Sequence, residues 1–316
     1  MSAPHEFTRQ DVTFSSGDTT CAASLYLPTG AEASPVVVLG HGLGATREMR
    51  LDAFAEWFPQ AGIAALAFTY RYFGDSGGQP RQLLSIKRQL ADWDAAIAYV
   101  KAHPDLDGDC VAVWGSSFGG GHAITVASRH PELAAAVAQC PFTDGLASAR
   151  ALGPMPSLKL TPVVARDLAA MLRGQAPVTV PLAAPHGSPA LMTAPDALPG
   201  YQALVPAGAS FVNEAAARVI PTIAAYRPGR AAKRIDLPIL FCVSNTDSVT
   251  PPAQTVRYAR TAPRGEIKTY DAGHFDFYLG DAFEALVRDQ VEFLTRHLAL
   301  AGTPSADSDR TAGIPR

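Results

Sequence analysis

The chain has 316 residues, of which 47% are hydrophobic and 17% charged, so it can bury a sizeable core and is not expected to be disordered. Its 26 basic and 29 acidic residues give a net charge of −3, and this near balance excludes a protein that works mainly by clamping nucleic-acid phosphates. We therefore expect no nucleic-acid partner.

Apolar runs of strand length alternate with longer amphipathic stretches through the first 145 residues. The expected strands are residues 11–16, 21–27, 35–42, 63–70, 109–115 and 133–140, and the expected helices are residues 47–61, 82–102 and 118–129. Residues 35–42 are β-branched in their first half, which is typical of a strand buried on both faces. This βαβαβ order predicts a parallel, doubly wound α/β sheet.

The alternation stops after Gly145. Residues 146–230 hold 12 of the 26 prolines, show no strand pattern, and carry helical patterns only near residues 161–173 and 212–226. Because proline interrupts helices, we expect short helices and extended linkers in this insert rather than one long helix. We interpret the insert as a cap that lies over the carboxyl edge of the sheet.

Strand and helix patterns resume at Leu237. The expected elements are strands at residues 237–244 and 266–272, a helix that begins at Pro252, and a helix over residues 281–299. Residues 1–145 and 231–300 therefore predict one core with eight strands, interrupted by the cap at residues 146–230. Residues 301–316 contain few side chains that could be buried, so we expect a disordered tail.

A Gly-x-Ser-x-Gly pentapeptide, Gly115 to Gly119, ends an expected strand and begins an expected helix. This context predicts a sharp turn that exposes the hydroxyl of Ser117, the middle residue, as a nucleophile. Side chains at Gly115 and Gly119 would collide with the neighbouring strand and helix. Ser116 is the alternative serine, but it does not occupy the middle of the pentapeptide.

A serine hydroxyl near neutral pH needs an adjacent base, and the base needs an orienting carboxylate. Asp247 and His274 each follow an expected strand, so both would lie with Ser117 at the carboxyl edge of a parallel sheet. We therefore predict a catalytic triad of Ser117, Asp247 and His274. Asp144, after the sixth strand, is the alternative acid, and His122 is expected to pack or cap rather than act as the base.

The segment Gly40-His41-Gly42-Leu43-Gly44 directly follows the apolar run PVVVL. A tetrahedral intermediate needs hydrogen-bond donors aimed at its oxyanion, each worth about 2.7–4 kcal/mol. We predict that the backbone amides of Leu43 and Phe118 form this oxyanion hole. His41 is expected to brace the loop and not to serve as a second base.

These segments, with the Arg71-Tyr72-Phe73-Gly74-Asp75-Ser76 loop, resemble the α/β-hydrolase superfamily over residues 10–145 and 231–300. Within it the chain looks closest to the serine-aminopeptidase-like and dienelactone-hydrolase-like esterases. The resemblance implies a mostly parallel, eight-stranded α/β-hydrolase sheet with a helical, proline-rich cap. Haloalkane dehalogenases, epoxide hydrolases and dienelactone hydrolases proper have Asp or Cys at the position of Ser117. The serine therefore implies cleavage of an ester, thioester, amide or carbon–carbon bond.

Together with the triad, the resemblance predicts a serine hydrolase that cleaves a carboxylic ester of a small, apolar substrate through an acyl-enzyme. Thioester, lactone and amide are variants of this reaction. Acyl transfer and carbon–carbon cleavage by the same triad are alternatives, and a non-catalytic binding protein is a third, against which the intact triad speaks. The sequence contains no HExxH motif, no clustered ligand set and no Walker-type loop, so we expect neither a metal nor a cofactor.

The residues that form the substrate pocket are harder to predict, because the insert matches no known pattern. We expect His41 and Tyr72 from the core, and Met155, Tyr201 and Phe211 from the insert, to line an apolar pocket. The insert also holds seven basic and three acidic residues. We expect its basic side chains to be solvated surface groups.

The four cysteines, Cys21, Cys110, Cys140 and Cys242, form no CxxC pair, which excludes zinc-knuckle and thioredoxin-type sites. We expect them to be reduced and packed in the core. The N-terminal segment lacks the apolar stretch of a signal peptide, and no run of 18 apolar residues occurs. We therefore expect a soluble, cytoplasmic protein without a membrane span, which binds a small-molecule substrate and has a homodimer as one option.

Overall fold

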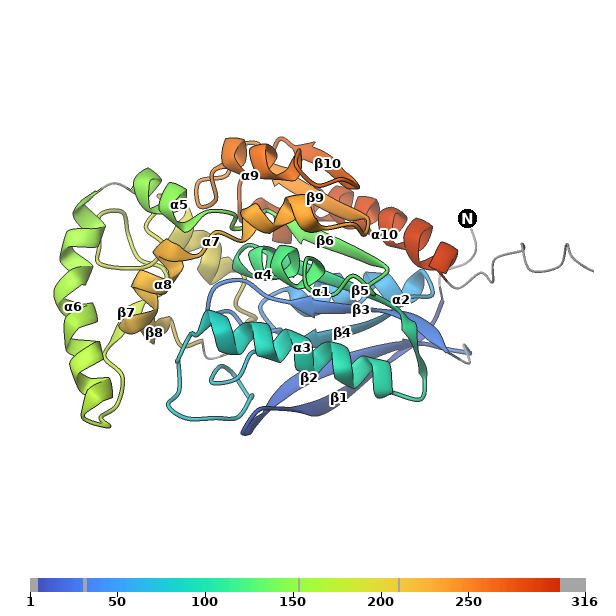
Figure 1. Ribbon diagram of the computed structural model, residues 1–316, viewed down its shortest axis with the longest axis horizontal. Coiled ribbons are helices and arrows are strands. Elements are labelled where there is room, and N and C mark those ends of the chain that lie inside the picture. Colours follow the sequence, from blue (N-terminus) through green and yellow to red (C-terminus); the bar gives the residue numbers. More distant parts are fainter. Residues whose placement is uncertain (1–4, 31–32, 153, 210, 302–316) are drawn as a thin grey trace, which may run out of the picture.

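The computed structural model describes residues 5–30, 33–152, 154–209 and 211–301. Eight strands form one mixed sheet in the order β1-β2-β4-β3-β5-β6-β9-β10 (Figure 1). The strands are β1 (Phe7–Ser16), β2 (Thr19–Pro28), β3 (Ser34–Gly40), β4 (Ala64–Phe68), β5 (Leu106–Ser116), β6 (Ala135–Gln139), β9 (Ile239–Ser244) and β10 (Gly265–Tyr270). The predicted eight-stranded, mostly parallel sheet is therefore confirmed.

The direction of each strand follows from the segment that precedes it. Gly17, at φ +63°, begins a two-residue turn, so β1 and β2 pair antiparallel with Ser16 opposite Thr19. β2 also runs antiparallel to β4, whereas β4, β3, β5, β6, β9 and β10 run parallel to one another. Val36–Val38 of β3 are fully buried, as expected of a strand covered on both faces.

Helices cover both faces of this sheet. α3 (Ile86–Ala102), α4 (Phe118–Ala127) and α9 (Pro252–Ala259) pack on one face, and α1 (Leu51–Ala55), α2 (Trp57–Gln60) and α10 (Gly280–Ala301) pack on the other (Figure 1). α3 buries Leu90, Trp93, Ile97 and Val100, whose three- and four-residue spacing predicts such a helix. Among the described residues, no helix combines the length and the apolar character that a membrane span requires.

Two core helices differ from their expected bounds. The helix expected over residues 47–61 begins only at Leu51, because Arg50 adopts a left-handed conformation at φ 71°, and it is divided into α1 and α2. Pro59 has no N–H with which to continue α1 into α2. The helix expected from residue 82 begins at Ile86, because Gln82 has φ 60° and cannot be helical.

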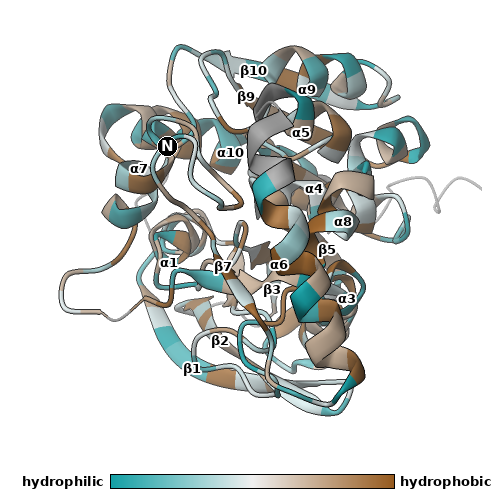
Figure 2. Ribbon diagram, turned by 90° about the vertical axis from the view of Figure 1, so that its left-hand side faces the viewer, coloured by the Kyte–Doolittle hydropathy of each residue, from teal (hydrophilic) through white to brown (hydrophobic). Residues whose placement is uncertain are grey.

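The insert, residues 146–230, folds at one end of the sheet (left in Figure 1). Its elements are α5 (Gly145–Leu152), α6 (Pro154–Leu172), β7 (Thr179–Pro181), α7 (Ala197–Ala203), β8 (Glu214–Ala216), the 3-10 helix η1 (Ala217–Val219), α8 (Ile220–Ala225) and the 3-10 helix η2 (Pro228–Arg234). Figure 2 views the molecule from this end and shows α6 and β7 in front of the sheet. The insert thus lies across an end of the sheet rather than on either of its faces.

Two expectations about the insert are wrong. β7 and β8 pair antiparallel, although strands of three residues are too short to show an alternating pattern in the sequence. The helix expected over residues 212–226 is replaced by β8, η1 and α8. α6 is one helix of 19 residues that contains Pro162 and covers most of the helical pattern expected near residues 161–173.

The four cysteines are all buried and unpaired. Cys21, Cys110 and Cys242 lie within β2, β5 and β9, as their apolar sequence surroundings predict. Cys140 instead follows β6 directly and lies at the carboxyl edge of the sheet. That edge is where the parallel strands also place Ser117, Asp247 and His274.

Candidate active site

The turn between β5 and α4 holds Ser117 in a strained conformation. Its backbone has φ 55° and ψ −117°, outside the regions open to most residues. A Cβ atom at Gly115 would lie 2.1 Å from the carbonyl oxygen of Gly119, and one at Gly119 would lie 2.4 Å from the carbonyl oxygen of His41. Because glycine occupies both positions, the strand can turn directly into the helix and present Ser117 at the elbow.

The side chains of Asp247, His274 and Ser117 form a continuous hydrogen-bonded row. His274 Nε2 lies 3.1 Å from Ser117 Oγ, and His274 Nδ1 lies 2.7 Å from Asp247 Oδ2. The other carboxylate oxygen of Asp247 accepts the backbone N–H groups of Val249 and Thr250, at 2.8 and 2.6 Å. The structure therefore brings together the three residues of the predicted triad, from the ends of β5, β9 and β10.

Burial and pairing set the charge of this row. Burial lowers the pKa of His274, but the adjacent Asp247 carboxylate outweighs it and raises that pKa well above its usual value. Burial raises the pKa of Asp247, whereas His274 and the N–H groups of Val249 and Thr250 lower it, and the net shift is downward. Asp247 is therefore ionised at neutral pH and stabilises a protonated His274.

Asp144, the alternative acid, is bonded elsewhere. Its Oδ1 accepts the N–H groups of Leu146 and Ala147 at the start of α5, at 3.0 and 3.1 Å, and its Oδ2 accepts the hydroxyl of Tyr258 at 2.8 Å. The guanidinium of Arg227 lies 3.7 Å from the same carboxylate. Asp144 therefore anchors the first helix of the insert, whereas Asp247 is the carboxylate on the histidine.

Ser116, the alternative serine, points away from the histidine. Its Oγ accepts a hydrogen bond from Gln139 Nε2 at 2.9 Å and lies 2.5 Å from the hydroxyl of Tyr278. Gln139 in turn accepts a hydrogen bond from Gln290 at 2.8 Å. Ser116 therefore belongs to a buried polar network behind the elbow.

Two further histidines near the site have structural contacts. His41 Nδ1 lies 3.0 Å from the carbonyl oxygen of Gly42, and burial lowers the pKa of His41 to about 4. His122 is held between the Tyr226 hydroxyl and the Gln89 side chain, at 2.9 and 3.0 Å, and burial lowers its pKa to about 3. Both rings are therefore neutral at pH 7, and these contacts are to the loop after β3 and to side chains of α3 and the insert.

The loop after β3 passes beside Ser117. A Cβ atom at Gly42 would lie 3.2 Å from Ser117 Cβ, so the absence of a side chain there permits the approach. The hydroxyl of Tyr201, from α7, donates to the carbonyl oxygen of Leu43 and so orients this part of the loop. Phe118 is the first residue of α4, where N–H groups lack a partner within the helix. The Leu43 and Phe118 amides are thus both close neighbours of the elbow.

The loop that contains Arg71 and Asp75 is tied to the loop after β3. Asp75 accepts two hydrogen bonds from Arg47, at 2.7 and 2.8 Å, and Arg71 Nε donates to the buried Asp92 at 2.7 Å. Arg47 follows the Gly40–Gly44 segment, so the ion pair with Asp75 ties the two loops together. In this chain the Arg-x-x-Gly-Asp-Ser loop therefore has a bracing role.

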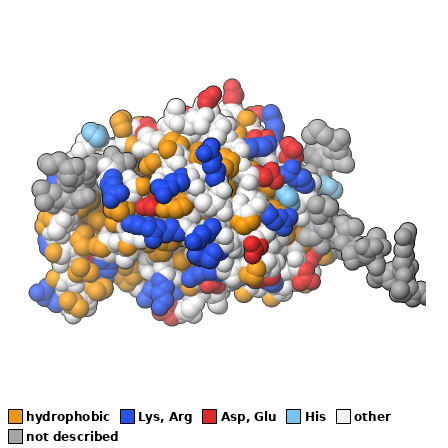
Figure 3. Space-filling model, turned by 45° about the horizontal axis from the view of Figure 1, so that its top comes forward, with side chains coloured by type: hydrophobic (Ala, Val, Ile, Leu, Met, Phe, Trp, Pro, Cys, Tyr) orange, Lys and Arg blue, Asp and Glu red, His pale blue; other side chains and the backbone are white. Residues whose placement is uncertain are grey.

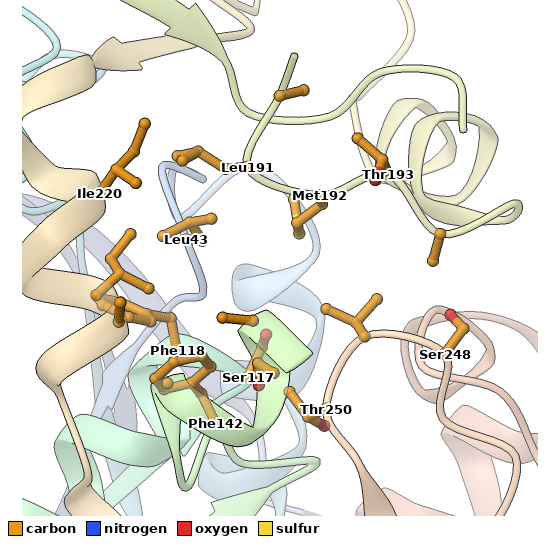
Figure 4. Close-up of a pocket in the computed structure, with 18 of the residues that line it drawn as sticks. Leu43, Ser117, Phe118, Phe142, Leu191, Met192, Thr193, Ile220, Ser248 and Thr250 are labelled. Carbon is orange, nitrogen blue, oxygen red and sulfur yellow. The ribbon is translucent and has the colours of Figure 1, made fainter. Parts of the chain in front are cut away.

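Two hollows meet at Ser117. The larger, of about 150 Å³, is lined mainly by apolar side chains, and none of the described residues that line it is charged (Figure 4). Its walls come from the core, with Leu43, Phe118, Phe142 and Thr250, and from the insert, with Leu160, Leu191, Met192, Ile220 and Ile223. The smaller hollow, of about 20 Å³, is lined by Tyr201, His274 and Tyr278 among others. His274 therefore borders the smaller hollow and not the larger one.

The predicted pocket residues are placed as follows. His41 and Tyr201 line the smaller hollow. Phe211 lines neither hollow, which corrects the prediction, and packs edge-on against the ring of Tyr201 with 5.3 Å between the ring centres. The side chain of Met155 lies outside the described residues.

The prediction that Tyr72 lines the pocket is wrong. Tyr72 is buried with φ 73°, its ring lies against Gly78, and the guanidinium of Arg88 lies 5.4 Å from the ring centre. Arg88 belongs to α3, on the far side of the bracing loop. Tyr72 therefore supports this loop from within and does not reach either hollow.

Most residues that line the larger hollow could not be predicted from the sequence as pocket residues. Leu160, Ile220 and Ile223 lie on helices of the insert, and Leu191 and Met192 lie in an irregular segment between them. These residues are far apart in the sequence and share no motif. In the sequence they are recognisable only as apolar residues of the insert. Residues that pack the insert onto the core are also apolar, so this property does not identify the wall of a pocket.

One set of ligand-type atoms clusters in the part of the chain that the structure describes. Cys140 Sγ, an Asp247 oxygen and a His274 nitrogen all lie within 4.8 Å of one another. Asp247 and His274 are already hydrogen-bonded to each other. A metal ion bound by these three residues would therefore compete with the row that ends at Ser117.

Comparison with known proteins decides the family. A family model described as Hydrolase_4, serine aminopeptidase S33, matches residues 31–277, which include the insert and the whole Ser117–His274–Asp247 row. The chain belongs to this α/β-hydrolase family. The predicted membership of the superfamily is thereby confirmed.

This S33-family hydrolase has relatives with different named roles. It is 53% identical over 286 residues to the quorum-quenching protein AidA of Acinetobacter baumannii, a match that covers 90% of this chain and 94% of the relative. It is 26% identical to the thiohydrolase aneE of Aspergillus aculeatus, over 87% of this chain and 89% of the relative. Its fold resembles that of the α/β hydrolase GrgF from Penicillium sp. sh18, with a TM-score of 0.78 and 24% identity over 92% of this chain and 99% of that one.

Proposed function

We propose that this hydrolase cleaves a carboxylic ester, or a related thioester, lactone or amide, by nucleophilic catalysis at Ser117. Ser117 Oγ attacks the carbonyl carbon of the substrate while His274 Nε2 takes its proton. Asp247 holds the imidazole in the tautomer whose free lone pair faces Ser117. The observation that carries the proposal is the unbroken row from Asp247 Oδ2 through both ring nitrogens of His274 to Ser117 Oγ.

The later steps follow from the same groups. The N–H groups of Leu43 and Phe118 hold the negative oxygen of the tetrahedral intermediate. Protonated His274 gives its proton to the leaving group, the bond to that group breaks, and an acyl-enzyme remains on Ser117. A water molecule that loses its proton to His274 then hydrolyses the acyl-enzyme. His274 is thus the base and then the acid in each half of the reaction.

The two hollows at Ser117 match the two halves of such a substrate. The leaving group must reach the proton on His274, so it occupies the smaller hollow that His274 lines. The acyl group then occupies the larger hollow, which requires it to be uncharged and apolar. An apolar cavity of about 150 Å³ binds benzene, so about six carbon atoms fit there. Because the insert supplies much of this wall, we propose that residues 146–230 act as the cap that sets specificity.

Hydrolysis of ethyl esters with acyl chains of rising length tests this proposal. Each buried methylene contributes about 0.8 kcal/mol, so we expect kcat/KM to rise about fourfold per carbon up to about six carbons and then to level or fall. Acid release in a pH-stat measures the rate. Rates independent of chain length, or a preference for a charged acyl group, would contradict the placement of the acyl group.

The same assay separates hydrolysis from its alternatives. The kcat/KM values for a thioester, a lactone and an anilide with the preferred acyl group show which type of bond the enzyme cleaves fastest. Free acid as the product distinguishes hydrolysis from transfer of the acyl group to an added alcohol or amine. The 53% identical relative is named for quorum quenching. This name favours a signalling molecule with a hydrolysable acyl bond as the natural substrate, and loss of signal in a quorum reporter strain measures it.

The pH dependence of kcat/KM follows from the row. His274 must be neutral to accept the proton of Ser117, and Asp247 raises the pKa of His274 above its ordinary value of 6.5. We therefore expect kcat/KM to increase with pH along an acid limb whose midpoint lies above pH 6.5. Removing the charge of Asp247 should move this midpoint to lower pH, because burial alone disfavours the imidazolium. A midpoint that does not move in the Asp247→Asn variant would contradict this coupling.

Bulk added to the wall of the larger hollow should shorten the preferred acyl chain. Ile223 lines the hollow and Ala225, two residues later on α8, does not. If Ile223→Trp prevents the burial of two methylenes, it lowers kcat/KM for the six-carbon ester about 15-fold and leaves the acetyl ester nearly unchanged. Ala225→Trp is the matched control. A uniform loss for all chain lengths would mean that α8 has only a structural role.

A further inference from the structure

Helix α6 of the insert has an inner face that is fully engaged. Leu160 lines the larger hollow, and Val163 and Val164 pack with Val180 and Ile220 in a small apolar cluster. The buried Asp167 accepts hydrogen bonds at 2.7–2.8 Å from Arg218 and from the backbone N–H of Val178. These contacts fix the orientation of α6, so its opposite face must point outward.

The outer face of α6 is apolar. Pro162, Ala165, Leu168 and Leu172 recur every three or four residues and are all exposed, which defines a stripe along the helix. Leu168 is 39% exposed, and Leu172 is 83% exposed at the last turn. Met171, beside the stripe, is 45% exposed. Figure 3 shows hydrophobic side chains together with basic ones at this end of the molecule (left). A stripe of large apolar side chains in water is a feature of interaction sites.

The charges beside this stripe have one sign. Lys159, Arg166 and Arg173 are exposed along the helix and at its end. Asp167 is the single acidic residue between positions 159 and 173, and it is fully buried against Arg218. Apart from Thr161, the exposed side chains of this segment are therefore apolar or basic, and none of them is a carboxylate.

A groove beside the end of α6 continues this surface onto the core. It has a volume of about 610 Å³ and is lined mainly by apolar side chains, such as Leu83, Ile86 and Met171. Its charged lining residues are Arg218 of the insert and Lys87, Arg88 and Arg129 of the core. In the part of the chain that the structure describes, no acidic side chain lines this groove. Arg218 is neutralised by Asp167, so the remaining three cations give the groove its positive charge. A negatively charged group is the occupant that this lining favours.

We propose that the outer face of α6 and the adjacent basic groove form a docking surface for an anionic lipid bilayer. The stripe would lie at the headgroup boundary, the flanking basic side chains would contact anionic headgroups, and the groove would take up a headgroup. A second copy of the chain fits this surface less well, because a symmetric contact would oppose Arg166 and Arg173 to the same cations of the partner. The inner face of α6 lines the larger hollow, so docking would bring that hollow close to apolar molecules dissolved in the bilayer.

Co-sedimentation with vesicles tests this proposal without measuring activity, so it is independent of the proposed hydrolysis. We expect the whole chain to bind vesicles of phosphatidylcholine with phosphatidylglycerol and not vesicles of phosphatidylcholine alone. The double variant R166Q/R173Q should bind about 30-fold more weakly. Each basic side chain near an anionic membrane surface contributes about 1 kcal/mol to binding, and the variant removes two of them. The control R257Q/R260Q removes two exposed arginines at the C-terminal end of α9, far along the chain from α6, and should bind as the wild type does. Raising the salt to about 1 M should weaken binding, since the Debye length falls to about 3 Å.

The apolar stripe is tested separately with the variant L168S/L172S, which should also lose vesicle binding while hydrolysing a short soluble ester at the wild-type rate. Equal binding to neutral and anionic vesicles, or unchanged binding of R166Q/R173Q, would overturn the proposal. Sedimentation equilibrium of the free protein tests whether a second copy of the chain occupies this surface. A dimer that L168S/L172S converts to a monomer, without a change in vesicle binding, would assign the surface to a second copy and overturn the proposal as well.

Discussion

Ser117→Ala is expected to lower kcat by about six orders of magnitude while the fold remains intact. The members of a serine triad act as one unit, and removal of the nucleophile alone costs about as much as removal of all three. Alanine retains the Cβ atom and removes only the hydroxyl, so circular dichroism and thermal unfolding should be nearly unchanged. Residual hydrolysis would come from substrate binding and the oxyanion hole.

Ser116→Ala is the matched control for this prediction. Ser116 is the neighbouring serine, but its hydroxyl is bonded to Gln139 and Tyr278 rather than to His274. Its loss should leave most of the activity and lower the stability, because the Gln139 amide loses a buried partner. A fluorophosphonate probe should label the wild type and Ser116→Ala, and should not label Ser117→Ala. Undiminished labelling of Ser117→Ala would disprove the assignment of the nucleophile.

Asp247→Asn is expected to lower kcat about 10⁴-fold, as in other serine triads that lose the orienting carboxylate. The asparagine oxygen can keep the hydrogen bonds from the N–H groups of Val249 and Thr250. The amide NH₂ would then face His274 Nδ1 as a donor and hold the ring with its proton on Nε2. That nitrogen faces Ser117 and could no longer accept the proton of its hydroxyl.

Asp144→Asn separates the two candidate acids. Asp144 anchors α5 and the Tyr258 hydroxyl, so its substitution should lower the thermal stability of the protein more than kcat. Both variants are measured with the preferred ester, together with the pH dependence of kcat/KM. If Asp247→Asn is nearly as active as the wild type and Asp144→Asn is inactive, the acid comes from the end of β6 and the proposed triad is wrong.

The residues of the site could be predicted because each follows a strand with a strong sequence signal. Ser117 lies between the apolar run VAVW and a helix pattern, and Asp247 and His274 follow the runs LPILFCVS and EIKTY. In a parallel sheet the ends of such strands meet at one edge, whatever their separation in the sequence. The bounds of β5, β9 and β10, and the row they assemble, agree with this reasoning.

The insert was predicted less well, because its structure depends on contacts that leave no local pattern. β8 has three residues and is a strand only because β7 lies beside it. α6 continues through Pro162 because its inner face is held by the ion pair of Asp167 with Arg218, 51 residues later. Prolines predict where helices are costly, but they do not show where tertiary contacts outweigh that cost.

The sequence by itself determined the eight-stranded core, the serine at the elbow and the family to which the chain belongs. Regular periodicity and short motifs encode these features locally, so one chain suffices to read them. Only the tertiary structure decided that Asp247 rather than Asp144 meets His274, that Tyr72 supports a loop rather than a pocket, and that two hollows of different size meet at Ser117. These outcomes depend on side-chain direction and on contacts between segments far apart in the chain, which the order of residues does not state.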